Sequence, residues 1–180
     1  MGHLTVIIGC MFAQKTTELL RHIRRYRSIG FRVLVINYKH DTRYGESVIA
    51  SHDLDTVPAL AVESLSEITE EMIKEYDVIV IDEGQFYPDL LEKVSSWVDT
   101  HDNLKVVVSG LDGDARRQPF GQMLQLIPHA ERVERLSSYC SVCRDGTAAH
   151  FSKRIVASDA TVEIGAADKY IPVCRKHLLS

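Results

Sequence analysis

Four side chains in the last part of the sequence have the types and spacing of a metal site. Cys140 and Cys143 form a C-x2-C pair, and Cys174 and His177 form a C-x2-H pair. Thiolates and imidazoles are the ligands of structural Zn2+ sites, and two such pairs complete a tetrahedron with no position left for a catalytic water. The alternative, surface thiols beside an incidental histidine, does not account for two pairs at this spacing. The sequence therefore predicts a structural zinc site.

A second group of residues has the layout of a phosphate-binding loop. An apolar run over residues 4–8 meets Gly9, and Lys15 and Thr16 open a basic segment that suits a helix. In the pattern G-x-x-x-x-G-K-[ST], backbone N–H groups and the helix N-terminus surround phosphate oxygens. Gly9, Lys15 and Thr16 match this pattern, but Gln14 replaces the second glycine. A side chain there hinders the dihedral and the close approach that glycine permits. Taken alone, the pattern also fits an ordinary buried strand-to-helix turn.

Two carboxylates follow the most continuously apolar strand, residues 77–81. Such a strand is typical of a parallel sheet covered on both faces, and its carboxyl end is expected to lie beside the phosphate loop. Asp82 then suits a water of a Mg2+ shell, and Glu83 suits accepting a proton from an attacking hydroxyl. Paired acids often end strands, so this interpretation depends on the neighbouring loop.

A polar stretch, residues 37–57, separates two predicted strands. It is too long for a tight connection, so it is either a functional loop or partly disordered. Arg43 stands two residues after Asp41 and is placed to contact a phosphate and the metal shell; the alternative is a surface salt bridge.

The elements that must position these groups alternate between strands and helices. Apolar periodicity predicts strands at 4–8, 31–36, 58–62, 77–81 and 104–109, and helices at 15–30, 64–76 and 88–101. An amphipathic segment follows through Leu124 and Ile127. The alternation predicts an α/β doubly wound parallel sheet over residues 1–137. Short β segments at 148–154 and 161–164 predict a small zinc-binding domain over residues 138–180.

Composition restricts the class of protein. The 180 residues are 45% hydrophobic and 26% charged, typical of a soluble globular chain. No apolar run is long enough to span a bilayer and no signal segment is apparent, so we expect a cytoplasmic protein without a membrane partner. The net charge of −4 gives no bulk attraction for nucleic acid. This balance, with a single zinc site, disfavours a zinc-ribbon nucleic-acid binder.

Taken together, the motifs resemble the type II (cytosolic, zinc-containing) thymidine kinases from His3 to His177. DEGQF, the zinc pairs and the ADKY loop make this resemblance far more specific than a phosphate loop alone. The matching segments are IIG-x-MF-x-x-KTTELL near the start, HDTRYG at 40–45, DEGQFYPD at 82–89, LDG and PFGQ within 111–122, FSKR at 151–154, VEIGAADKY at 162–170 and VCRKH at 173–177.

The resemblance implies a RecA-like, P-loop α/β domain joined to a zinc-binding domain whose lasso loop closes over thymidine. It implies transfer of the γ-phosphoryl group of ATP to the thymidine 5′-hydroxyl with Mg2+, in pyrimidine salvage for DNA synthesis. It further implies feedback inhibition by dTTP, and either a homo-oligomer or pairing with a second kinase copy.

The resemblance also assigns roles to single residues. Glu83 is implied as the general base. The residues implied to hold ATP phosphates and Mg2+ are Gly9, Lys15, Thr16, Asp41, Arg43 and Asp82. Those implied to line the thymidine pocket are Met11, Phe86, Leu111, Phe120 and Tyr170, with backbone groups from Val162 to Ile164 reading the thymine edge.

The chain departs from the family pattern in the phosphate cradle and the nucleoside pocket. The usual loop reads G-P-M-F-S-G-K; Cys10, Ala13 and Gln14 replace its proline, serine and second glycine. A usual lysine is Asn37, and a usual aromatic residue is Ala115.

Two functions therefore stay open: a thymidine kinase with weakened activity, and an inactive thymidine-kinase-like domain with a structural or regulatory role, one copy of a tandem protein. We expect either a loop relaxed away from its nucleotide-holding shape or a Gln14 side chain in the place of the β-phosphate.

Overall fold

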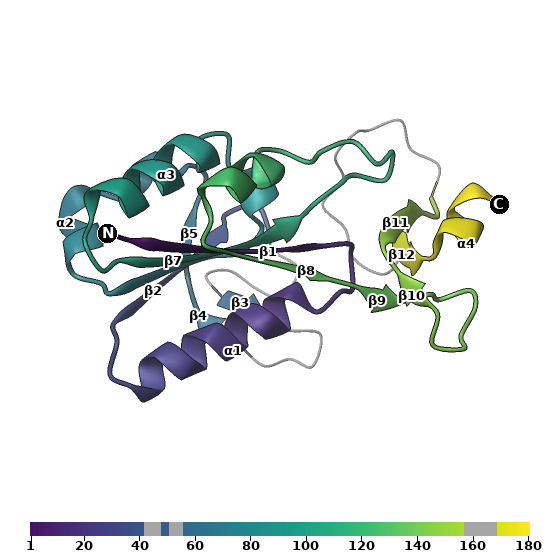
Figure 1. Cartoon of the computed structure of the whole chain (residues 1–180), viewed down its shortest axis with the longest axis horizontal. Helices are drawn as coiled ribbons and strands as arrows, with labels where there is room; N and C mark the ends of the chain where they lie inside the picture. Colours follow the sequence, from purple (N-terminus) through teal and green to yellow (C-terminus); the bar gives the residue numbers. More distant parts are fainter. Residues whose placement is uncertain (42–47, 51–55, 157–168) are drawn as a thin grey trace.

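A six-stranded sheet with the order β5-β2-β6-β7-β1-β8 forms the centre of the protein (Figure 1). The computed structural model describes residues 1–41, 48–50, 56–156 and 169–180. All pairings within this sheet are parallel, which confirms the α/β prediction. Its strands are β1 (His3–Gly9), β2 (Val33–Tyr38), β5 (Leu60–Val62), β6 (Val78–Ile81), β7 (Lys105–Leu111) and β8 (Arg132–Leu136).

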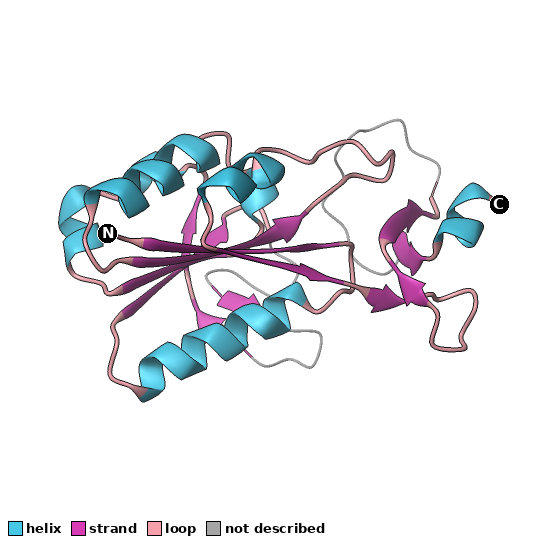
Figure 2. Cartoon of the chain, viewed as in Figure 1, coloured by secondary structure: helices cyan, strands magenta, loops and turns pink. Residues whose placement is uncertain are grey.

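Helices cover both faces of the sheet (Figure 2). Helix α1 (Lys15–Ser28) lies on one face, and α2 (Glu70–Lys74) and α3 (Leu90–Thr100) lie on the other. Short 3-10 helices connect the elements: η1 (Leu65–Glu67), η2 (Gly84–Phe86) and η3 (Met123–His129). Among the described residues, no helix combines the length and the apolar character that a membrane crossing requires.

Alternate side chains of each central strand enter two separate hydrophobic cores. On β1, Val6 and Ile8 pack with Leu90, Val94 and Trp97 of α3, whereas Ile7 faces the opposite core. That second core contains the buried α1 residues Leu19, Leu20 and Ile23. Strands buried on both faces need apolar residues at every position, and this explains why β1, β6 and β7 are continuous apolar runs.

A smaller unit follows β8 at one end of the sheet (Figure 1). It contains two antiparallel strand pairs, β9 with β10 and β11 with β12, and a short terminal helix. The predicted division between residues 137 and 138 falls between β8 and β9. The elements are β9 (Ser138–Tyr139), β10 (Ala148–Ala149), β11 (Phe151–Arg154), β12 (Tyr170–Val173) and α4 (Arg175–Leu179).

Several elements differ from the prediction. The helix expected over 64–76 is two pieces, because Ser64 caps η1 through a capping box with Glu67 and Thr69 starts α2 with a second cap. The stretch 37–57 is not an uninterrupted loop, since it contains β3 (Val48–Ala50) and the start of β4 (Thr56–Pro58), which pair antiparallel. Strands β8 and β12 were not predicted from the sequence, and the expected segment 161–164 lies outside the described residues.

The turn before η3 packs closely on the backbone of η2. At Gly121, φ is +55°, and a Cβ would lie 2.2 Å from the Gln85 carbonyl oxygen. Gly146 also has a positive φ, of +88°, but a Cβ there would meet nothing within 4 Å. The two glycines therefore share a conformational constraint and differ in free space.

We predict that Gly121→Ala destabilises the protein more than Gly146→Ala. Both changes place alanine in the left-handed region, at roughly 1 kcal/mol each. Gly121→Ala adds a collision with backbone, for which about 1–3 kcal/mol is typical of overpacking. Urea unfolding of both variants measures the difference, and equal losses of stability would contradict the packing described here.

Candidate active site and metal centre

The loop between β1 and α1 keeps left-handed backbone at residues that carry side chains. The φ angles of Phe12 and Gln14 are 61° and 59°. Gln14 is also the N-cap residue of α1, without a side-chain capping bond. Such a conformation costs a non-glycine residue roughly 1–2 kcal/mol. Gln14 therefore holds a left-handed backbone although it carries a side chain.

The Gln14 side chain is exposed and lies at a surface hollow of about 380 Å3. The hollow is bounded by the loop, the start of α1 and the end of β8, with Thr17 and Leu136 among its lining residues. Whether Gln14 also occupies the place of a β-phosphate stays a prediction.

The first glycine of the loop is fixed by the neighbouring edge strand. At Gly9, a Cβ would lie 2.5 Å from the Leu136 carbonyl oxygen, and φ is +155°. No other residue fits this approach without displacing β8.

Lys15 and Thr16 begin α1 and point toward the carboxyl ends of the neighbouring strands. Lys15 Nζ donates to the Cys10 carbonyl oxygen at 2.8 Å, and Thr16 Oγ1 donates to Asp82 Oδ2 at 3.1 Å. Burial lowers the pKa of Lys15, while the carboxylate of Glu83 partly opposes this effect. The predicted neighbourhood of the phosphate loop and Asp82 is confirmed, although β7 lies between their strands.

Asp82 is a buried carboxylate that joins three elements. Its Oδ1 accepts hydrogen bonds from Ser109 Oγ at 2.6 Å and from the Glu83 N–H at 3.0 Å. Its Oδ2 accepts from Thr16, so α1, β7 and the end of β6 meet at one side chain. Ser109 had no role in the sequence analysis, because a serine within an apolar strand gives no signal of its partner.

Gln85 positions the side chain of Glu83. Gln85 Nε2 donates to Glu83 Oε2, and Gln85 Oε1 accepts from the Leu111 N–H at 3.0 Å. Glu83 has a left-handed backbone, with φ of 54°, which turns the chain sharply after β6. This role of Gln85 was not predicted from the sequence, although its place in the DEGQFYPD segment was the available signal.

Three residues predicted to line a nucleoside pocket lie near one another. The Phe86 ring stacks on Tyr38, with centroids 5.0 Å apart, and meets Phe120 edge-on at 5.6 Å. Leu111 is connected to this region because its N–H donates to Oε1 of Gln85, the residue before Phe86. In the sheet, Leu111 pairs with Gly9 at the end of β1.

The other predicted binding residues lie elsewhere or outside the described residues. The Met11 N–H donates to Ser152 Oγ at 3.0 Å, and the Tyr170 hydroxyl accepts from Arg154 at 2.9 Å in the smaller unit. Asp41 is buried after the end of β2. The Asp41 N–H donates to the carbonyl oxygen of Tyr38, on which Phe86 stacks, at 2.9 Å. Three predicted residues lie outside the described part of the chain: Arg43, Val162 and Ile164.

Of the departures from the family pattern at Asn37 and Ala115, the structure explains the first. Asn37 is buried, and its Nδ2 donates to the Val48 carbonyl oxygen at 3.2 Å, so it fastens β3 to β2. Ala115 is half-buried, and nothing in the structure explains why an aromatic residue is missing there.

The four predicted zinc ligands converge, with ligand atoms all within 4.8 Å of one another. His177 Nδ1 lies 3.5, 3.3 and 3.4 Å from the sulfur atoms of Cys140, Cys143 and Cys174. These separations suit ligands around one tetrahedral ion with bonds of about 2.0–2.3 Å. Although burial raises the pKa of Cys140, backbone hydrogen bonds from Cys143 and Cys174 outweigh it and bring the pKa to about 5. A thiolate at neutral pH is the form that binds zinc.

The metal centre is physically connected to the phosphate loop. Cys10 Sγ donates to the Ala149 carbonyl oxygen at 3.4 Å, and the Met11 N–H donates to Ser152 Oγ. Ala149 packs with Cys140 and Val173 in the core around the metal ligands. The predicted zinc ligands thus share a core with the strands against which the loop rests.

We predict that Cys140→Ser abolishes tight zinc binding and loosens the phosphate loop. A hydroxyl is a poor zinc ligand, and without the ion the small core around Ala149 lacks its main crosslink. Metal analysis measures the first effect, and hydrogen exchange at residues 10–13 measures the second. Cys10→Ser is the matched control, because its thiol is outside the ligand set, and it should retain one zinc ion per chain. Zinc retention by Cys140→Ser would contradict the assignment.

Comparisons with known proteins agree in one family. A family model described as thymidine kinase matches residues 2–178. The thymidine kinase of Yaba monkey tumor virus is 44% identical over 174 residues, covering 97% of this chain and 93% of the viral protein. The human cytosolic thymidine kinase is 40% identical over 174 residues, covering 97% of this chain and 72% of the human protein. Thymidine kinase 1 of Dictyostelium discoideum is 39% identical over 178 residues, with shares of 97% and 76%.

Proposed function

Because the chain belongs to the thymidine kinase family, we propose that it transfers the γ-phosphoryl group of ATP to the 5′-hydroxyl of thymidine, giving dTMP and ADP. The observation that carries the proposal is the meeting of Lys15, Thr16, Asp82 and Glu83 at the carboxyl ends of β1, β6 and β7. Phosphoryl transfer needs these groups together, because catalysis depends on positioning and on stabilisation of charge.

In this proposal Gly9 and the backbone of the loop surround the phosphates, and the Lys15 ammonium neutralises them. Thr16 Oγ1 and Asp82 Oδ2, 3.1 Å apart, are the oxygen ligands that Mg2+ prefers, directly or through water. The cation, when bound with ATP, neutralises charge on the phosphates. We assign Asp41 and Arg43 to the phosphates and the metal shell as well.

Glu83 accepts the proton of the attacking 5′-hydroxyl. Gln85 holds the Glu83 carboxylate through Nε2 and is itself fixed by the Leu111 N–H. An oriented carboxylate beside a lysine can take up a proton without rearrangement of its neighbours. The thymidine would lie on the Phe86 and Phe120 side of the site, enclosed by Met11, Leu111, Tyr170 and backbone from Val162 to Ile164.

The alternative is an inactive domain, in which Gln14 prevents ATP binding. The left-handed backbone at Gln14 supports the active form, because the loop adopts at this residue a dihedral of the kind that glycine permits. The exposure of the Gln14 side chain supports the same choice.

Glu83→Gln tests the assignment of the general base. The substitution keeps the size of the side chain and removes its proton affinity, so kcat on thymidine should fall by about 10²–10⁴-fold while binding of ATP-Mg2+ changes little. Steady-state kinetics and calorimetric titration measure the two quantities separately. Unchanged turnover would mean that another group accepts the proton.

The variant Gln14→Gly distinguishes the active kinase from the inactive alternative. If the parent loop already has its binding shape, the Kd for ATP-Mg2+ should change less than about tenfold, equivalent to about 1.4 kcal/mol. The inactive alternative instead predicts that affinity appears only in the variant. Asn103→Gly is the matched control, because Asn103 also has a positive φ, of 66°, and lies in the remote turn before β7.

A further inference from the structure

The surface hollow beside the phosphate loop has the size of a ligand site. Its volume is about 380 Å3, within the range of about 300–1,000 Å3 that small-molecule pockets have. One wall is formed by the loop and the first turn of α1, and the other by the chain where β8 passes into β9. Two loop residues that depart from the family pattern, Ala13 and Gln14, belong to the lining. The hollow therefore adjoins the residues proposed to hold phosphates.

The sheet order places the hollow and the proposed thymidine side on opposite sides of β1. Strand β7 ends at Leu111 and Phe86 follows β6; both strands lie on one side of β1, and β8 lies on the other. In phosphoryl transfer the attacking and leaving oxygens lie roughly in line, with the transferred group between them. The nucleoside of the phosphate donor is therefore expected on the side away from thymidine, which is the side of β8 and the hollow.

Tyr139 brings an aromatic ring to this hollow. The residue is 73% exposed, although its backbone pairs with Ala148 in the small sheet of β9 and β10. Aromatic side chains bind nucleobases by stacking, and this interaction tolerates different bases because every base has a π face. Tyr139 is thus placed to stack on a base in the hollow.

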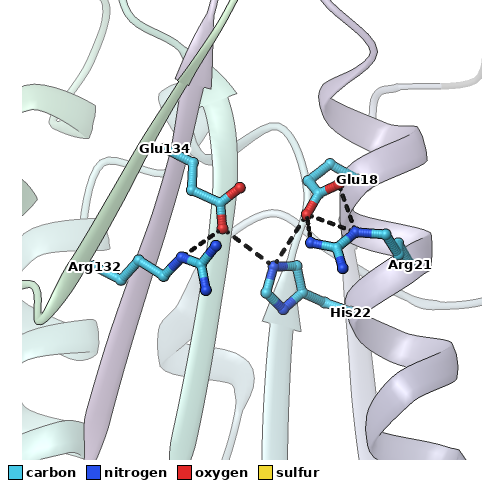
Figure 3. Close-up of polar contacts among 5 residues, drawn as sticks. All are labelled: Glu18, Arg21, His22, Arg132 and Glu134. Carbon is cyan, nitrogen blue, oxygen red and sulfur yellow. Dashed lines mark hydrogen bonds and ion pairs between the residues drawn. The ribbon is translucent and has the colours of Figure 1, made fainter.

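The negative charge in the lining is compensated by a neighbouring arginine (Figure 3). Among the described residues, Glu18 is the one charged residue of the lining. Arg21 Nε donates to both of its oxygens, at 2.9 and 2.8 Å, and His22 Nε2 lies 3.4 Å from Glu18 Oε1. An ion pair of this kind weakens the repulsion between the carboxylate and the phosphates of a nucleotide.

We propose that the hollow binds the nucleobase of the phosphate donor, with Tyr139 as the stacking surface and a determinant of donor specificity. This inference rests on the proposed kinase function. It assigns the phosphates to the loop from Gly9 to Thr16 and the base to the junction of β8 and β9, so that the smaller unit contributes a residue to the donor site.

The polar side chains of the lining predict how the donor base is selected. Apart from the paired Glu18, each of them both donates and accepts hydrogen bonds, so each matches adenine as well as guanine. These residues are Gln14, Thr17, Ser137 and Ser138. The Kd values of ATP-Mg2+ and GTP-Mg2+ should therefore differ by about tenfold or less, equivalent to about 1.4 kcal/mol.

The test is calorimetric titration of the full chain with the Mg2+ complexes of ATP, GTP and inorganic tripolyphosphate, which has phosphates but no base. Tyr139→Ala should weaken binding of ATP and GTP by about fivefold or more, because base stacking is lost, and leave binding of tripolyphosphate unchanged. Tyr139→Phe is the matched control, because it keeps the ring and should bind all three as the parent does.

Three results would overturn the inference. The first is ATP affinity unchanged in Tyr139→Ala, and the second is an equal loss of ATP and tripolyphosphate affinity, which would mean that Tyr139 supports the loop. The third is a parent that binds ATP no more tightly than tripolyphosphate, or ATP more than about a hundredfold more tightly than GTP. Failure of the proposed function is a separate observation, because the parent would then form no dTMP from thymidine and ATP.

Discussion

The candidate site depends on one buried carboxylate, that of Asp82. It accepts hydrogen bonds from Thr16 on α1, from Ser109 on β7 and from the Glu83 N–H at the end of β6. A buried carboxylate needs several donors to offset the loss of hydration, so these elements are held at fixed distances from one another. The same three bonds that satisfy Asp82 therefore align the start of the phosphate-loop helix with the Glu83 carboxylate.

The smaller unit that follows β8 also holds the phosphate loop, through hydrogen bonds that involve backbone groups. The sulfur atoms of three cysteines gather around His177 Nδ1, and β10 and β11 contact Cys10 and Met11 of the loop. Lys153 adds a further constraint, because its Nζ donates to the His177 carbonyl oxygen at 2.8 Å and holds the short helix α4 in place. A zinc ion bound by these four residues would therefore influence the loop through packing, at a distance from the phosphate-binding residues.

The sequence predicted the features that follow from period, spacing and residue chemistry. Continuous apolar runs located β1, β6 and β7, and paired cysteines located the metal centre. It could not predict β8, because an edge strand exposed on one side carries polar residues such as Arg132 and Glu134. It also missed Ser109 and Gln85, since their partners are distant in sequence and only the fold brings them together. The left-handed backbone at Gln14 was unexpected, because intrinsic propensity opposes it and tertiary contacts decide it.

The sheet order has a consequence for the synthesis of the chain on the ribosome. The first strand synthesised, β1, finds its neighbours only in β7 and β8, about a hundred residues later. At typical rates of 5–20 residues per second, both edges of β1 stay unpaired for on the order of ten seconds. An apolar strand with two open edges readily pairs with other chains. Nascent chains of this protein are therefore most vulnerable to aggregation before Leu136 emerges, and holdase chaperones would act in that interval.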